Sequence, residues 1–241
     1  MKKTLLRPLL CLAALPFVAC SSTKTPPPEP AALEPSVRPG VNERFLAPDM
    51  QVEEFITLFE GESREIAVQR EALVAALELA PGMSVADVGA GTGLFLEPLD
   101  REVGPKGRVF AVDIAPKFVE HLRSRVARES REGVQVVLCT EHSVELPKGS
   151  IDVAFVCDTY HHFEYPRSTL ASLHDALRPG GRLVVVDFDR IPGVSREWCL
   201  EHVRAGKDVV LAEIEAAGFG FVREVEIEGL SENYVLVFRR L

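Results

Sequence analysis

The order of strand and helix patterns is the feature that most constrains the fold of this chain. Five short apolar runs predict strands, and helical patterns separate most of them, with the strands expected over 83–88, 108–112, 134–138, 151–156 and 183–186. Strands that alternate with helices require a parallel sheet with right-handed crossovers. Two further strands are expected over 221–227 and 234–238, and their short connection leaves no room for a crossover, so this pair should be antiparallel. The sequence therefore predicts an α/β fold with a doubly wound, mostly parallel seven-stranded sheet and an antiparallel C-terminal hairpin.

Helical spacing of apolar residues predicts the elements between the strands. The first helical region covers 55–79 and is stopped by Pro81 and Gly82. Further helices are expected up to about Val103 and over 116–131, 167–177 and 196–217.

The first part of the chain differs in composition from the rest. Three basic residues precede an apolar run over 9–18, which has the length of a signal-peptide core and is too short to span a bilayer. The run ends just before Cys20 in a pattern similar to a bacterial lipobox, and a Pro-rich polar stretch that cannot form a core follows. The sequence predicts a signal peptide over 1–19, a tether over 20–48 and one folded domain over 49–241.

Charge and the N-terminal pattern limit the partners of the chain. The formal net charge is −9, and an acidic protein repels a phosphate backbone, so no nucleic-acid partner is expected. A lipid on Cys20 would be the means of membrane attachment, which predicts a lipoprotein anchored on the extracytoplasmic or periplasmic side of a bacterial membrane. A cytoplasmic enzyme with an uncleaved hydrophobic N-terminus is the alternative. The oligomeric state stays open.

A glycine-rich turn follows the first predicted strand. Gly89, Gly91 and Gly93 let the backbone bend sharply and lie directly against a ligand. Asp87 on the strand before them would repel a pyrophosphate but attract a cationic ligand. Asp113 ends the second strand, where an acid accepts hydrogen bonds from ribose hydroxyls, although an acid there can also cap the following helix.

Five local motifs occur in the order and at the spacings typical of one enzyme family. They cover 85–93, 112–113, 145–147, 151–155 and 177–183. On these motifs, the region over 73–241 resembles the class I S-adenosylmethionine-dependent methyltransferases. The resemblance implies a Rossmann-like fold, S-adenosylmethionine as cofactor, and methyl transfer to an unidentified, small-molecule acceptor.

The resemblance also assigns the residues that bind the cofactor. It places the methyl donor against the glycine turn and the neighbouring strand ends, at Asp87, Gly89, Ala90, Gly91, Thr92, Gly93, Asp113, Ile114 and Asp158. It places an adenine contact in the loop after the third strand. Glu141 is the favoured residue there, with His142 and Ser143 as alternatives.

Candidate catalytic residues follow the fourth strand, at the sheet edge where open α/β folds bind ligands. His161 or His162 could remove a proton from the acceptor, and local packing is the alternative role for both. Metal ligation by these histidines is not favoured, and no metal is assigned. His202, in the region after the fifth strand, is interpreted as a residue on the surface of a helix.

Two other segments are expected beside the acceptor. The segment Asp187-Phe188-Asp189 is assigned to the wall of the acceptor site. A magnesium site made by Asp187 and Asp189 with Asp158 is the less favoured interpretation. Arg64 lies in a segment expected to act as a lid, where it could meet a carboxylate, although an exposed arginine usually has no specific partner.

Two other function classes share parts of this pattern. An oxidoreductase of the NAD type has a similar glycine turn, but Asp87 and the closing hairpin argue against it. A non-catalytic nucleoside-binding lipoprotein is consistent with export, because S-adenosylmethionine is made in the cytoplasm and an exported enzyme would lack a supply. Calorimetry with S-adenosylmethionine and with NAD would distinguish these classes.

Overall fold

The computed structural model describes Met1, residues 34–61 and residues 64–241. The expected signal peptide, Cys20 and the first part of the tether lie outside the described residues. A compact unit covers Glu34–Leu241, so residues 34–48, which the sequence assigned to the tether, belong to the same unit as the predicted domain over 49–241. The reason is that the Glu34 carboxylate accepts hydrogen bonds from the backbone N–H groups of Arg167 and Ser168, at 2.8 and 2.7 Å, and so attaches this segment to the domain.

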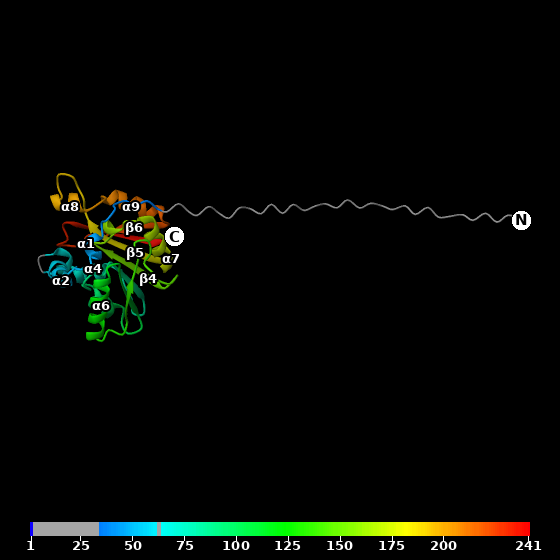
Figure 1. Ribbon diagram of the computed structural model, residues 1–241, viewed down its shortest axis with the longest axis horizontal. Helices are drawn as coiled ribbons and strands as arrows, with labels where there is room; N and C mark the ends of the chain where they lie inside the picture. The colour runs from blue at the N-terminus through cyan, green and yellow to red at the C-terminus, as the bar shows by residue number, and fades with distance from the viewer. Residues whose placement is uncertain (2–33, 62–63) are drawn as a thin grey trace. The chain divides into compact units, whose positions relative to one another are not determined.

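A seven-stranded sheet in the order β3-β2-β1-β4-β5-β7-β6 forms the centre of the unit (Figure 1). The strands are β1 Ser84–Val88, β2 Arg108–Asp113, β3 Val134–Leu138, β4 Ile151–Cys157, β5 Leu177–Phe188, β6 Phe219–Glu224 and β7 Asn233–Arg240. The first five are parallel, whereas β7 runs antiparallel to both β5 and β6. The predicted mixed, Rossmann-like sheet is confirmed. All five residues of β1 are buried, as expected for a strand covered on both faces.

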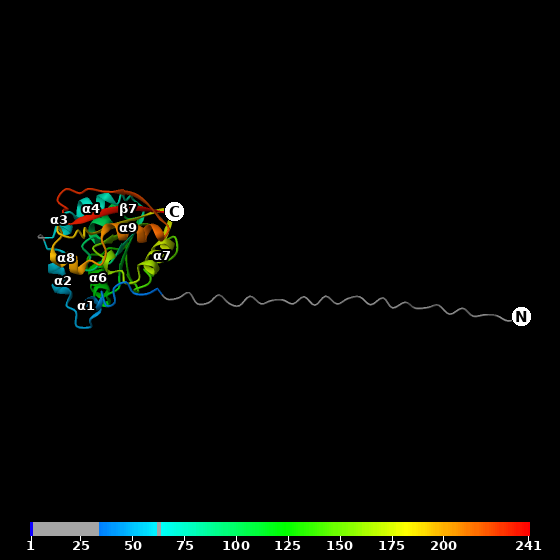
Figure 2. The same cartoon turned by 90° about the horizontal axis from the view of Figure 1, so that it is seen from above.

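Helices cover both faces of the sheet. The elements are α1 Glu43–Leu46, α2 Val52–Phe59, α3 Glu65–Val68, α4 Arg70–Ala76, α5 Leu96–Val103, α6 Pro116–Arg128, the 3₁₀ turn η1 Tyr160–His162, α7 Pro166–Ala176, α8 Glu197–His202 and α9 Lys207–Ala216. Alternation along β1 separates two cores: Val85 belongs to the core that contains residues of α4, α5 and α6, and Ala86 belongs to the core that contains residues of α7 and α9. Both views place α2 and α8 at the same end of the domain (Figure 2).

Two predicted helices are interrupted in the structure. The region over 55–79 contains the end of α2 and the whole of α3 and α4 as separate helices. The region over 196–217 is divided into α8 and α9. The second interruption has a local cause, because Val203 and Gly206 both adopt extended conformations between the helices. Among the described helices, none combines the length and the apolar character needed to cross a membrane.

Candidate active site

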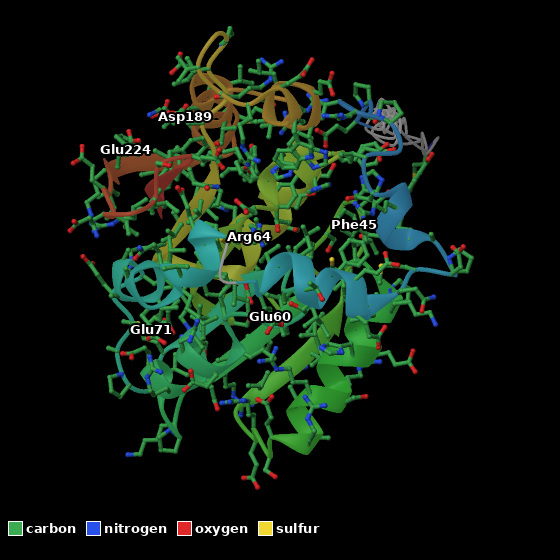
Figure 3. All side chains as sticks on the ribbon, turned by 90° about the vertical axis from the view of Figure 1, so that its left-hand side faces the viewer. Phe45, Glu60, Arg64, Glu71, Asp189 and Glu224 are labelled. Carbon is green, nitrogen blue, oxygen red and sulfur yellow. The ribbon has the colours of Figure 1, made fainter. Side chains whose placement is uncertain are left out.

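A cavity of about 1080 Å³ lies at the carboxyl ends of the parallel strands. Its floor includes the glycine turn after β1, and its walls come from residues that follow β2, β4 and β5. Segments around α1 and α2 contribute its aromatic side. Figure 3 views this end of the domain, with Arg64 near the centre and Phe45 of α1 beside α2. The position agrees with the ligand-binding edge of open α/β sheets.

The glycine turn requires glycine for both conformation and space. Gly89, Gly91 and Gly93 have φ angles of 80°, 53° and 92°. A Cβ atom on Gly89 would lie 2.2 Å from Oγ1 of Thr159, so no side chain fits between the turn and β4. Gly93 serves a different purpose, because its missing Cβ makes room for Leu96 of α5, and Gly93 does not line the cavity.

Asp87 presents an unsatisfied carboxylate oxygen beside this turn. The side chain is on β1, lines the cavity and is 2% exposed, and its Oδ2 atom has no hydrogen-bond partner among the described residues. Burial, followed by the charge of Asp113, raises the pKa of Asp87 to about 7. A buried polar atom without a partner is unfavourable, so a cationic ligand placed here would remove the penalty.

Asp113 supports the turn as well as lining the cavity. Its Oδ2 accepts a hydrogen bond from the backbone N–H of Gly91, and its Oδ1 accepts one from Ala115, both at 2.8 Å. Burial raises its pKa to about 6 against the opposing effect of these hydrogen bonds. Asp113 can make the expected ribose contact and still bind the Ala115 N–H at the start of the next helix, because each carboxylate oxygen can accept two hydrogen bonds.

Asp158 lies in a strained position at the end of β4. Its φ angle is 47°, and its carboxylate forms an ion pair with Arg64 and accepts a hydrogen bond from Nδ2 of Asn233 at 2.7 Å. Burial raises the pKa of Asp158, and the Arg64 guanidinium partly opposes this rise. Arg64 therefore has a specific partner and connects the segment before α3 to the sheet edge.

His161 is held by the carboxylate of Asp187 at the end of β5. Nδ1 of His161 lies 2.7 Å from Oδ1 of Asp187, and the backbone N–H of His161 donates to Oδ2 at 2.9 Å. The two side chains are 4% and 2% exposed. Asp187 lies behind His161 and does not line the cavity, which corrects its assignment to the acceptor wall. Because Asp187 occupies Nδ1, the second ring nitrogen of His161 is available for other chemistry.

His162 and His202 complete a group of three imidazole rings with His161. The ring centroids of His162 and His202 lie 4.3 and 5.1 Å from that of His161, respectively. His202 lines the cavity and stacks on Trp198 at 4.7 Å, so it is not the plain surface residue that the sequence suggested. Burial, then the neighbouring His161, lowers the pKa of His162 to about 2 and that of His202 to about 4. His162 is therefore a poor proton acceptor near neutral pH.

None of the three residues considered for the adenine contact, Glu141, His142 and Ser143, lines the cavity. The His142 ring stacks on Tyr165 with centroids 4.0 Å apart, and the Glu141 backbone carbonyl accepts a hydrogen bond from Thr169. The loop after β3 thus packs against the start of α7. Apart from Gly93, the remaining residues assigned to the cofactor do line the cavity, namely Asp87, Gly89, Ala90, Gly91, Thr92, Asp113, Ile114 and Asp158.

The carboxylates of the less favoured magnesium site have other partners. Asp158 is bound by Arg64 and Asn233, and Asp187 is bound by His161. Asp189 faces Lys207, with a nitrogen-to-oxygen distance of 3.9 Å. Each of the three carboxylates therefore binds a different side chain, and this arrangement does not favour a shared magnesium site.

The aromatic lining is the main feature that sequence reasoning missed. Phe45, Phe55, Phe59 and Phe118 line one side of the cavity, and Trp198 lines another, together with Phe188, which the sequence had assigned to the acceptor wall. Phe45 falls within the predicted tether, and the other missed residues occupy helices whose inward faces could not be told from ordinary core positions. The only sequence feature that could have indicated these residues was their apolar character.

Comparisons with known proteins agree with this geometry. The family described as "Methyltransferase domain" matches residues 86–185. Over 120 residues the chain is 38% identical to the "Uncharacterized 37.1 kDa protein in transposon TN4556" of Streptomyces fradiae, covering 50% of this chain and 34% of that protein. It is 32% identical over 139 residues to nocamycin O-methyltransferase of Saccharothrix syringae, covering 57% of this chain and 49% of that enzyme. The chain thus matches half or less of the length of these curated relatives.

A solved structure matches a larger part of the chain. A SAM-dependent methyltransferase from Aquifex aeolicus superposes with a TM-score of 0.70 and 25% sequence identity, over 79% of this chain and 99% of that one. Together these similarities indicate S-adenosylmethionine as the cofactor, as the sequence predicted. Residues 86–185 thus match a methyltransferase-domain family, and the chain has an α/β, Rossmann-like methyltransferase fold.

Proposed function

We propose that this protein transfers a methyl group from S-adenosylmethionine to a hydroxyl group of a small acceptor held in the same cavity. The observation that carries the proposal is the unpartnered, buried Oδ2 of Asp87 beside a turn where a Cβ atom would collide with Thr159. This arrangement suits a ligand that presses against bare backbone and carries a positive charge.

The two ends of S-adenosylmethionine match the two carboxylates on the floor. The amino group of the methionine part would pair with Asp87, and the ribose hydroxyls would donate to the remaining lone pairs of Asp113. Ionised Asp87 would repel the pyrophosphate of NAD, which disfavours the oxidoreductase alternative.

The opposite end of the cavity supplies the groups that would act on the acceptor. S-adenosylmethionine, when bound, supplies a methyl group that is already activated on a sulfonium. The chain must then align the acceptor, exclude water and accept a proton. His161 is the candidate proton acceptor, because Asp187 holds its ring and would stabilise the imidazolium.

Two observations support a small hydroxyl acceptor. The cavity volume of about 1080 Å³ is near the upper end of the usual range for small-molecule sites, so it has space for the cofactor and one compact second molecule. A relative that shares 32% identity over 139 residues is an O-methyltransferase by name. The aromatic side of the cavity favours an acceptor with a flat apolar part.

The proposal is tested in two stages with full-length protein. Calorimetry should show one S-adenosylmethionine bound per chain and no binding of NAD. Incubation with S-adenosylmethionine and a panel of small phenols and alcohols should then release S-adenosylhomocysteine with an equal amount of methylated product. Binding without transfer to any hydroxyl compound would favour the non-catalytic alternative, and tight NAD binding would contradict the proposal outright.

We also propose that Cys20 carries a lipid that anchors the protein outside the cytoplasm. The support is the sequence pattern alone: a short apolar run between basic residues and Cys20, followed by a Pro-rich stretch. Cells fed a palmitate analogue should label the wild type and not Cys20→Ala. Unlabelled wild-type protein in the soluble fraction would contradict the proposal.

A further inference from the structure

We propose that His161, His162 and His202 bind a divalent transition-metal ion of the zinc type at the acceptor end of the cavity. One ring nitrogen from each of the three side chains lies within 4.8 Å of the others. Three histidines that hold zinc at about 2.0–2.1 Å place their nitrogens roughly 3.4 Å apart in a tetrahedral arrangement. Side-chain shifts of about an ångström would therefore bring the three rings to coordinating positions.

An unpartnered nitrogen is the second observation that points to a ligand. Nδ1 of His162 is buried, and no residue in the part of the chain that the structure describes forms a hydrogen bond with it. Ordinary packing does not explain this atom, because buried polar atoms are nearly always satisfied. Coordination of an ion would satisfy it.

Asp187 gives His161 the arrangement found around protein-bound metals. A histidine ligand usually bonds a carboxylate or carbonyl through its second ring nitrogen, which sets the ring orientation and strengthens the ligand. Here Nδ1 of His161 lies 2.7 Å from Oδ1 of Asp187, so the other nitrogen is free to coordinate. Phe188 and Trp198 pack against the histidine rings and supply an apolar surround.

Charges around the cluster act in both directions. Asp187 favours a bound cation. Arg38 opposes it, because its guanidinium donates hydrogen bonds to the backbone carbonyls of His202 and Glu201. We therefore expect binding of moderate strength with a marked dependence on Asp187.

The ion would have an open coordination position facing the acceptor. All three histidines line the cavity, and a site with three protein ligands retains a fourth position for water or substrate. This consequence rests on the proposed function. An acceptor hydroxyl bound to the ion would lose its proton to solvent more readily. Its oxygen would then form a bond to the methyl carbon of S-adenosylmethionine while the carbon–sulfur bond breaks, and the electron pair of that bond would go to sulfur. In that case His161 would act as a ligand and not as the proton acceptor.

The test is a titration of tag-free, full-length protein with Co²⁺, whose visible absorption distinguishes four-coordinate from six-coordinate sites. Wild type should bind one ion per chain with the intense four-coordinate spectrum, and Zn²⁺ should displace it. His202→Ala should lose that spectrum, and Asp187→Asn should weaken binding about 10–100-fold. His174→Ala is the matched control and should bind as wild type, because His174 packs against Phe219 away from the cluster.

Two results would overturn the inference. One is a wild-type protein that is folded by circular dichroism and gives no saturable Co²⁺ spectrum. The other is an equal affinity in wild type and His202→Ala. Calorimetry with S-adenosylmethionine separates this inference from the proposed function. A protein that binds the metal but not S-adenosylmethionine would contradict only the proposed function. A protein that binds S-adenosylmethionine but not the metal would contradict only the metal site.

Discussion

The two ends of the cavity are built in different ways. At the cofactor end, neighbouring residues of β1 and β2 hold the glycine turn through backbone hydrogen bonds, such as those from Gly89 and Ala90 to the Val112 carbonyl at 2.8 and 3.0 Å. At the acceptor end, the contacts join distant parts of the chain, as in the pairs Arg64–Asp158 and His161–Asp187. The first end depends on local backbone shape, whereas the second depends on side chains brought together by the whole fold. Changes at the first should therefore affect cofactor binding, and changes at the second should affect turnover.

The largest effect is expected from Gly89→Ala. The new Cβ atom would meet Oγ1 of Thr159 at 2.2 Å, in a backbone conformation with a φ angle of 80°, so the turn must move and calorimetry should detect no S-adenosylmethionine binding. Gly82→Ala is the control, because Gly82 has a φ angle of 91° but open space around it. Gly82→Ala should lose about 1–3 kcal/mol of stability from backbone strain and keep the cofactor affinity. Equal cofactor affinity in Gly89→Ala and wild type would contradict the view that cofactor binding depends on the backbone shape of the glycine turn.

Next in size is the effect of His161→Gln on turnover. Loss of a positioned proton acceptor typically lowers the rate by about 10²–10⁴-fold, and the loss of a metal ligand would also act on the rate. Because the change lies at the acceptor end, kcat should fall while the calorimetric affinity for S-adenosylmethionine stays within about twofold of wild type. An equal loss in both quantities would show that the two ends are not separable.

A smaller effect is expected from Asp113→Ala. The variant removes an acceptor of ribose hydrogen bonds and also the support for the Gly91 N–H, so S-adenosylmethionine affinity should fall by about 1–3 kcal/mol. Asp100→Ala serves as a control, since Asp100 forms a salt bridge with Arg131 outside the cavity. If the cofactor binds Asp113→Ala and wild type equally, the ribose assignment is wrong.

The smallest effect is a dependence of cofactor affinity on pH. With a pKa of about 7 in the folded protein, Asp87 is mostly protonated at pH 6 and mostly ionised at pH 8. An ammonium group prefers the ionised form, so S-adenosylhomocysteine should bind about tenfold more tightly at pH 8, and Asp87→Asn should remove the difference. A flat profile in the wild type would contradict the assignment.

The same pKa shift has a consequence for the cofactor-free protein. Because folding raises this pKa from 3.8 to about 7, the folded state binds the proton more tightly than the unfolded state. The resulting stabilisation is complete below about pH 4 and is lost as the pH rises through 7. The thermal midpoint of Asp87→Asn should therefore fall less over this interval than that of wild type.

The same contrast explains what the sequence could predict. The succession of strands and helices, the glycine turn and the positions of Asp87 and Asp113 follow from local patterns, because adjacent βα units allow few topologies. The partners of Arg64, Asp187 and His202 could not be predicted, because each depends on how separate segments pack. The inclusion of 34–48 in the domain was missed for a similar reason, since Glu34, Arg38 and Asn42 attach to distant parts of the chain a segment whose composition indicates a tether.

We propose that S-adenosylmethionine lies over the glycine turn between the two carboxylates of β1 and β2. A crystal structure of the complex with S-adenosylhomocysteine would show whether it does. We predict the ribose hydroxyls within hydrogen-bonding distance of Asp113 and the amino group within hydrogen-bonding distance of Oδ2 of Asp87. A nucleoside bound elsewhere, or a cavity left without it at saturating concentration, would contradict the account.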